Sequence, residues 1–171
     1  MNKRTLSLVQ GAMIAALYAA LVYAQNMLLP GTTSMMVQFR VAELLCIFAL
    51  WTPAAIWGLT LGCVLANIGN IGQLPLDVLF GSLATLLAAI CIWKLRNIRL
   101  KGMPLLSLSM PAIFNAIIVG LELKFYLGDE SPLWLLCLCV AAGEVVVVLI
   151  AGTPLAMLIE KKGYLEKMKL Q

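Results

Sequence analysis

The chain alternates between long apolar stretches and short breaks that contain proline, glycine or charged residues, such as Thr52-Pro53 and the basic segment 94–102. A helix needs about 20 apolar residues to cross the hydrocarbon core of a bilayer. The pattern therefore predicts a single all-α integral membrane domain, residues 1–171, with six transmembrane helices. Their expected bounds are about 6–29, 36–51, 53–68, 76–93, 104–127 and 133–159.

Two prolines refine this plan. Pro53 is well placed as the first residue of the third helix, where its missing N–H costs nothing. Pro154 lies inside the sixth stretch and predicts a kink there. The second and third stretches are the shortest and are joined by a tight turn.

Composition excludes several classes of protein. Apolar residues make up 63 % of the chain and charged residues 12 %, which is far from the soluble range. The chain has no histidine, so imidazole metal ligands and histidine-based catalysis are excluded. It also has no Gly-x-x-x-x-Gly-Lys motif, so it cannot hydrolyse ATP itself. We interpret the five cysteines as small apolar packing residues. They are Cys46, Cys63, Cys91, Cys137 and Cys139.

The charges predict an orientation. Ten of the twelve basic residues fall into three clusters near the N-terminus, after the fourth stretch and near the C-terminus. Basic clusters mark the cytoplasmic side, and an even number of spans places both termini there, N-in and C-in. The inner side then carries a net charge of +8, and the outer side with the membrane −4. The clusters are Lys3/Arg4, Lys94/Arg96/Arg99/Lys101 and Lys161/Lys162/Lys167/Lys169.

Small residues form a stripe on the first predicted helix. Ala12, Ala16, Ala20 and Ala24 recur every four residues. Such a stripe lets another helix approach closely because nothing larger than a methyl group projects from it. Packing within the chain and docking of another membrane protein both fit this pattern, and the sequence does not separate them.

Polar residues gather in the outer halves of the predicted helices. Glu144 lies about a dozen residues into the sixth helix, on the order of 18 Å from its outer end. A lone carboxylate at that depth costs about 3 kcal/mol, so it must be protonated, paired or held for a ligand. Asn115 and Glu122 are seven residues apart and share a face of the fifth helix. Glu144 and Glu122 are therefore the first candidates for contact with a ligand.

A second group of candidates comprises Asn115, Asn67, Asp77, Arg40 and Glu43. Arg40 and Glu43 are three residues apart and can pair on one helical face, either as part of a site or as an ion pair without function. Asn67 and Asp77 flank an outer turn and can instead cap it. An acid-rich pocket suits a small cation with N–H donors, because a carboxylate accepts two parallel N–H bonds from a planar edge. Phe39, Tyr23 or Trp134 can stack on a flat ring.

Four segments of the chain carry a resemblance to a known family: QFRVAE at 38–43, TPAA at 52–55, LGCVLAN at 61–67 and LDVLFGSLATL at 76–86. Together they resemble the QueT family, the substrate-binding S components of energy-coupling factor (ECF) transporters assigned to queuosine precursors. The basic N-terminus, the alanine stripe and the six-span plan extend the resemblance over nearly the whole chain.

The resemblance implies an ECF S-component-like bundle in the bacterial plasma membrane, crossed several times, that binds substrate and catalyses no reaction. The substrate enters from outside beneath a loop at about 26–38. The alanine stripe docks onto a transmembrane coupling subunit, which two cytoplasmic ATPase subunits drive, and the S component topples to release substrate inward. No cofactor is implied.

The expected ligand is 7-aminomethyl-7-deazaguanine or a close relative, which is cationic and presents a guanine edge. The alternatives are an S component for another small cationic vitamin or metabolite, a membrane-embedded enzyme using paired carboxylates, and a structural assembly factor.

Overall fold

The computed structural model describes residues 2–30, 32, 37–69 and 75–162, with the side chains of Pro75 and Asp77 left aside. Over these residues the chain is helical and forms no β-strand. The elements are α1 (Lys3–Leu28), the 3-10 helix η1 (Val41–Leu50), α2 (Ala54–Ile68), α3 (Pro75–Leu95), α4 (Leu105–Leu108), α5 (Met110–Phe125), α6 (Leu133–Glu144), the π-helix η2 (Val145–Gly152) and α7 (Thr153–Lys161).

Four helical segments in the described part of the chain are long and apolar enough to cross a membrane: Lys3–Leu28, Val78–Leu95, Leu105–Phe125 and Leu133–Lys161. Val41–Leu50 and Ala54–Ile68 are apolar but shorter. The prediction of an all-helical fold with long apolar helices is therefore confirmed over the described residues. Six complete spans stay a prediction, and the second predicted stretch is a ten-residue helix that begins only at Val41.

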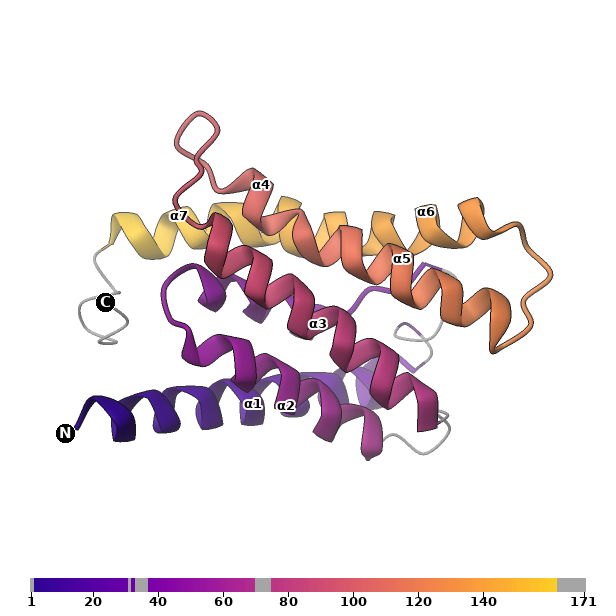
Figure 1. Ribbon diagram of the computed structural model, residues 1–171, viewed down its shortest axis with the longest axis horizontal. Coiled ribbons are helices and arrows are strands. Elements are labelled where there is room, and N and C mark those ends of the chain that lie inside the picture. The colour runs from indigo at the N-terminus through magenta and orange to yellow at the C-terminus, as the bar shows by residue number, and fades with distance from the viewer. Residues whose placement is uncertain (1, 31, 33–36, 70–74, 163–171) are drawn as a thin grey trace.

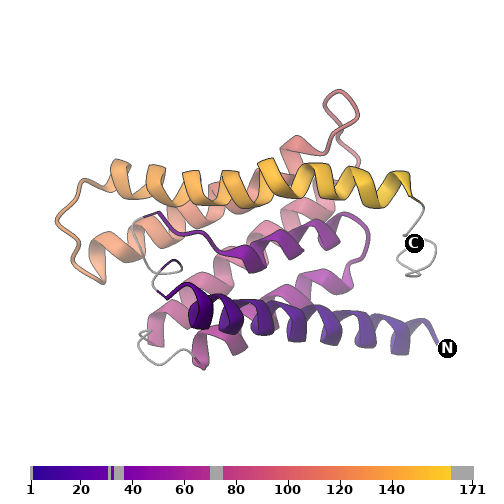
Figure 2. The same ribbon diagram turned by 180° about the vertical axis from the view of Figure 1, so that it is seen from behind.

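The helices lie in a bundle with η1 inside it. Figure 1 shows α1 and α2 side by side, α5 beside α6, and α3 between the two pairs, in agreement with the contacts between these elements. The start of α1, the end of α7 and the loop between α3 and α4 lie at one end of the molecule, and the α5–α6 loop lies at the other (Figures 1 and 2). The basic ends of α1, α3 and α7 therefore gather at one end. Lys167 and Lys169 lie outside the described residues.

The α1–α2 pair is held by close backbone contact. A Cβ atom on Gly58 of α2 would lie 2.7 Å from the carbonyl oxygen of Gly11, and one on Gly62 would lie 2.9 Å from that of Ala15. Only glycine permits this approach, which is how small residues bring membrane helices together. The face of α1 that packs in this way contains Gly11, Ala15 and Ala19.

The predicted alanine stripe lies on a different face of α1. Ala12, Ala16, Ala20 and Ala24 are all exposed. These four residues therefore do not contribute to the buried packing of α1 against the rest of the chain. They remain available to lipid or to another protein.

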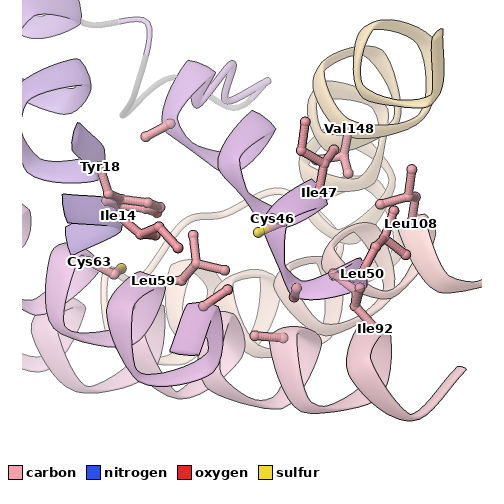
Figure 3. Close-up of a cluster of buried hydrophobic side chains, with 14 of the residues drawn as sticks. Ile14, Tyr18, Cys46, Ile47, Leu50, Leu59, Cys63, Ile92, Leu108 and Val148 are labelled. Carbon is pink, nitrogen blue, oxygen red and sulfur yellow. The ribbon is translucent and has the colours of Figure 1, made fainter. Parts of the chain in front are cut away.

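The core joins both halves of the bundle through η1. Figure 3 shows Cys46, Ile47 and Leu50 between the α1–α2 side chains of Tyr18 and Leu59 and the side chains of Ile92, Leu108 and Val148. Cys46 and Cys63 are buried in this core, and all five cysteines are free thiols. The structure thus agrees with a packing role for these two residues.

A π-helix lies directly before Pro154, where the sequence predicted a kink, and the kink itself stays a prediction. Pro154 has no N–H to donate to the preceding turn, and its ring crowds the carbonyl four residues earlier. The eight residues of η2 lie directly before α7, in which Pro154 occupies the first turn. A wider turn at this point relieves the crowding. Glu144 is the last α-helical residue before the change, so its side chain lies at this junction.

At the end of the molecule where α1 begins and α7 ends, Glu160 of α7 links three elements. It accepts hydrogen bonds from Trp51 Nε1 (3.0 Å) and from Arg99 Nη1 and Nη2 (3.1 and 2.8 Å). Trp51 follows η1 and Arg99 follows α3. The ion pair is about 30 % exposed on each side, so it contributes little stability but fixes the position of the loop.

Candidate functional site

Glu144 is buried in the bundle with one oxygen bonded and the other not. Asn115 Nδ2 donates to Glu144 Oε1 at 2.8 Å, which joins α5 to α6. Among the described residues, Glu144 Oε2 and Asn115 Oδ1 have no hydrogen-bond partner although both atoms are buried. Buried acceptors without donors are costly, and each needs an explanation such as a ligand. The pair therefore presents two acceptors to a molecule that carries N–H groups.

The segment before η1 lies directly beside Glu144. A Cβ on Gly143 would lie 2.0 Å from the carbonyl oxygen of Gln38, so the Gln38 backbone rests against α6 at a place only glycine allows. The Gln38 side chain is buried as well. The segment that leads to Arg40 therefore packs on α6 next to the residue that carries the carboxylate.

Arg40 brings a positive charge to this region. Its guanidinium interacts electrostatically with the carboxylates of Glu43 and Glu144. Its Nη1 atom lies 3.5 Å from the Cβ position of Gly81 on α3, and Asn67 Nδ2 lies 3.0 Å from the same point. Arg40 and Asn67 thus meet over Gly81, where a larger residue would separate them.

Arg40 and Glu43 do not share a helical face as the sequence suggested. Arg40 precedes η1 in an extended conformation (φ −93°, ψ 94°). No ion pair within 4 Å joins these two described residues. The spacing rule failed because the helix begins between them.

Glu43 has hydrogen-bond donors on both oxygens. Tyr18 Oη donates to Oε1 at 2.5 Å and Thr85 Oγ1 at 3.4 Å, and Cys46 Sγ donates to Oε2 at 3.0 Å. The residue is fully buried. Glu43 therefore ties α1 and α3 to η1, and its carboxylate is occupied by the protein.

Glu122 lines a separate groove between α3 and α5 with a volume of about 410 Å³. Glu122 is itself buried, and it is the charged residue in an otherwise mostly apolar lining. The lining residues are Leu76, Phe80, Leu83, Ile118, Leu121, Glu122, Phe125 and Tyr126.

The predicted site residues thus divide into two sets. Arg40, Glu43, Asn67, Asn115 and Glu144 converge inside the bundle. Glu122 lies in the neighbouring groove, and the Asp77 side chain lies outside the described residues.

The predicted stacking residues are dispersed. Tyr23 Oη donates to the Leu65 carbonyl at 2.8 Å, so this ring lies against α2. Trp134 is 64 % exposed at the start of α6. Phe39 belongs to the segment before η1 and is 39 % exposed.

Sequence reasoning missed Tyr18, Thr85 and Gln25. Tyr18 and Thr85 complete the Glu43 network. Gln25 is buried and bonded to residues 32, 39 and 41. The sequence contains only a weak signal for Gln25. It is a polar residue near the end of an apolar helix, and it lies seven positions after Tyr18, so the two residues share one face of that helix.

Comparison with known proteins identifies the family. The chain belongs to the QueT transporter family, whose model matches residues 8–161. No curated protein and no solved structure shows significant similarity to it. The family, together with the long apolar helices, establishes a membrane protein with a role in transport as a substrate-binding S component.

Proposed function

We propose that this member of the QueT transporter family is the S component of an ECF-type importer that captures a queuosine precursor, 7-aminomethyl-7-deazaguanine or a close relative. The observation that carries the proposal is the buried Glu144–Asn115 pair, with one acceptor on each residue unpartnered among the described residues. A transporter needs such groups satisfied by its substrate rather than by the protein.

The chemistry of the pair matches the guanine edge. That edge presents a ring N–H and an amino group side by side, and a carboxylate accepts two such parallel bonds. Glu144 Oε2 and Asn115 Oδ1 are the acceptors offered here. Arg40 can donate to the ring carbonyl, since its guanidinium has donors only.

The charge balance favours a cation. Glu43, Glu122 and Glu144 are buried carboxylates, and they outnumber Arg40 and Lys124, the two basic residues outside the three clusters. The aminomethyl group of the ligand supplies a positive charge, and we place Glu122, in its apolar groove, as the carboxylate that receives it.

Release of the substrate requires partners. We propose that the exposed stripe of Ala12, Ala16, Ala20 and Ala24 docks onto a transmembrane coupling subunit. Two cytoplasmic ATPase subunits would hydrolyse ATP, because the chain has no phosphate-cradling motif. The gathering of basic helix ends at one end of the molecule supports an N-in, C-in orientation with six crossings of the bacterial plasma membrane.

The direct test is a titration of the purified protein with 7-aminomethyl-7-deazaguanine. Glu144→Gln should weaken binding more than tenfold, because an amide replaces one of the two acceptors with a donor. Glu160→Gln is the matched control at the far end of the same helical segment and should bind as wild type does. Unchanged affinity in Glu144→Gln would remove this residue from the site. If the wild-type protein does not bind 7-aminomethyl-7-deazaguanine but another small cation raises its unfolding temperature, that cation would become the proposed ligand.

The docking surface has its own test in cells that contain the coupling and ATPase subunits. Ala16→Leu should abolish uptake and leave substrate binding intact, because a larger side chain keeps the partner helix away. Ala151→Leu is the matched control, since Ala151 is exposed on η2. Loss of binding in Ala16→Leu would mean that the stripe supports the fold instead.

A further inference from the structure

Gln25 makes hydrogen bonds on both sides of Arg40. Its Oε1 atom accepts from the backbone N–H of Val41 at 3.0 Å, and its Nε2 atom donates to the backbone carbonyl of Phe39. The side-chain amide of Gln25 therefore donates one hydrogen bond and accepts another from the backbone of residues 39–41, as a peptide group of an adjacent strand would. The side chain is buried, so water cannot easily replace these bonds.

The same side chain secures the preceding turn. Gln25 Nε2 also donates to Thr32 Oγ1 at 3.0 Å, and the Phe39 N–H donates to the Thr32 carbonyl at 3.0 Å. Thr32 Oγ1 in turn donates to the Leu29 carbonyl at 2.8 Å. One residue in the last turns of α1 thus holds Thr32 and Phe39–Val41 together.

The position of Arg40 depends on this arrangement. Both peptide groups that flank it are bonded to Gln25, and its own carbonyl accepts the Glu43 N–H that begins η1. Its guanidinium can therefore reach only a limited region, which lies over Gly81 beside the carboxylates of Glu43 and Glu144. Without these hydrogen bonds the backbone at residue 40 would adopt many conformations, and the long arginine side chain would point in many directions.

We propose that Gln25 is a positioning residue for ligand recognition, which acts by fixing Arg40 over the Glu144 site. The inference is tested by two experiments. Only the ligand-binding experiment rests on the proposed function, because the geometry also makes a prediction that needs no ligand. Gln25 also joins α1, the helix with the exposed alanine stripe, to the segment that packs on α6 beside Gly143.

The ligand-independent arm is limited proteolysis of the full-length protein in detergent. Trypsin cleaves after Arg40, at the peptide bond whose N–H is bound to Gln25. Gln25→Ala should raise the rate of cleavage there roughly tenfold, because the segment opens more often once two bonds are lost. Gln25→Glu should also accelerate it, since a carboxylate cannot donate to the Phe39 carbonyl.

Two controls accompany this arm. Cleavage after Lys101, in the exposed α3–α4 loop, is the internal standard and should not change. Gln10→Ala makes the same substitution near the other end of α1, where Gln10 accepts from Thr52 Oγ1, and should leave cleavage after Arg40 as in wild type. An unchanged rate in Gln25→Ala would overturn the inference and leave the proposed function standing.

The binding arm is a double-mutant cycle with 7-aminomethyl-7-deazaguanine. Gln25→Ala should weaken binding roughly tenfold in the wild-type background and less than twofold in Arg40→Met, which keeps the stem of the side chain and removes the charge. A residue that only stabilises the fold would have the same effect in both backgrounds, and that result would overturn the inference. If the wild type does not bind this ligand while cleavage still accelerates, the ligand proposal fails and the positioning role is supported.

Discussion

Glu43 and Glu144 are two carboxylates buried in the same bundle with opposite hydrogen-bonding states. Glu43 accepts from Tyr18, Thr85 and Cys46, so both of its oxygens are bonded within the protein. Glu144 accepts from Asn115 on one oxygen, and its other oxygen has no partner among the described residues. Burial does not distinguish the two side chains, but the number of hydrogen-bond donors does.

The difference separates a structural carboxylate from one suited to a ligand. A buried polar group that is fully bonded stabilises the arrangement of its donors, here α1 and α3 around η1. A group that is half bonded is costly until another molecule completes it. Arg40 interacts electrostatically with both residues, so the two regions adjoin. The predictions below test whether this division of roles is correct.

The largest expected effect is on stability. Glu43→Leu leaves the buried donors Tyr18 Oη and Cys46 Sγ without their acceptor, while Thr85 Oγ1 keeps its bond to the Gly81 carbonyl, and it should cost about 3 kcal/mol. The same exchange at Glu144 breaks one bond and removes an unpartnered acceptor, so it should cost much less. Thermal unfolding of both variants in detergent, without ligand, measures the contrast. Equal losses would show that Glu144 is as structural as Glu43.

The next effect is on affinity. Asn115→Leu removes the donor that orients Glu144 and one of the two unpartnered acceptors. We expect affinity for 7-aminomethyl-7-deazaguanine to fall roughly tenfold, which corresponds to about 1.4 kcal/mol. Asn67→Leu, at the edge of the same region, should have a smaller effect. The dissociation constants of the two variants measure the difference. A larger dissociation constant for Asn67→Leu than for Asn115→Leu would place the site nearer α2 than α5.

A smaller effect follows from one hydrogen bond of Glu43. Tyr18→Phe keeps the ring and deletes the hydroxyl that donates to Glu43, so stability should fall by about 1–2 kcal/mol while ligand affinity stays constant. Tyr23→Phe removes a hydroxyl that donates to the Leu65 carbonyl at a more exposed place and should cost less. Weaker ligand binding in Tyr18→Phe would mean that the Glu43 network belongs to the site.

The smallest effect concerns a carboxylate exposed to water. Asp129 accepts from the Ser131 N–H at 2.8 Å, and this bond lowers the pKa of Asp129. Because the pKa of Asp129 is lower in the folded protein than in the unfolded chain, the bond stabilises the loop at pH values above the unfolded-state pKa. This stabilisation is lost as the pH falls through the folded-state pKa. The Ser131 amide proton resonance should therefore move between about pH 5 and about pH 2. Asp129→Asn should abolish the movement, and persistence of the movement would assign it to another group.

Much of the fold could be predicted from local patterns. The apolar stretches at 6–29, 104–127 and 133–159 correspond to long helical segments of the structure. A kink was expected at Pro154, and the structure has a π-helix directly before it. The second stretch was less accurate, because apolar composition cannot tell an extended residue such as Arg40 from the first turn of the helix that follows it. The spacing of Arg40 and Glu43 was misleading for the same reason.

The exposed alanine stripe is a second feature that local patterns could not resolve. Ala12, Ala16, Ala20 and Ala24 alternate along α1 with Gly11, Ala15 and Ala19, and both sets obey the same small-residue rule. The sequence could not say which set packs within the chain. The positions of Gly58 and Gly62 on α2 decide it, because only there do the two backbones come close enough.

By itself, the sequence determined the membrane environment, the helical class, the resemblance to a transporter family and the presence of polar residues in the apolar helices. These properties depend on hydropathy, on charge position and on short motifs, which are local along the chain. The tertiary structure alone decided that Glu43 is occupied, that Glu144 has an unpartnered oxygen and that Gln25 positions the residues around Arg40. Each of these depends on donors and acceptors from separate helices, and no pattern within one helix records how many partners another helix will bring.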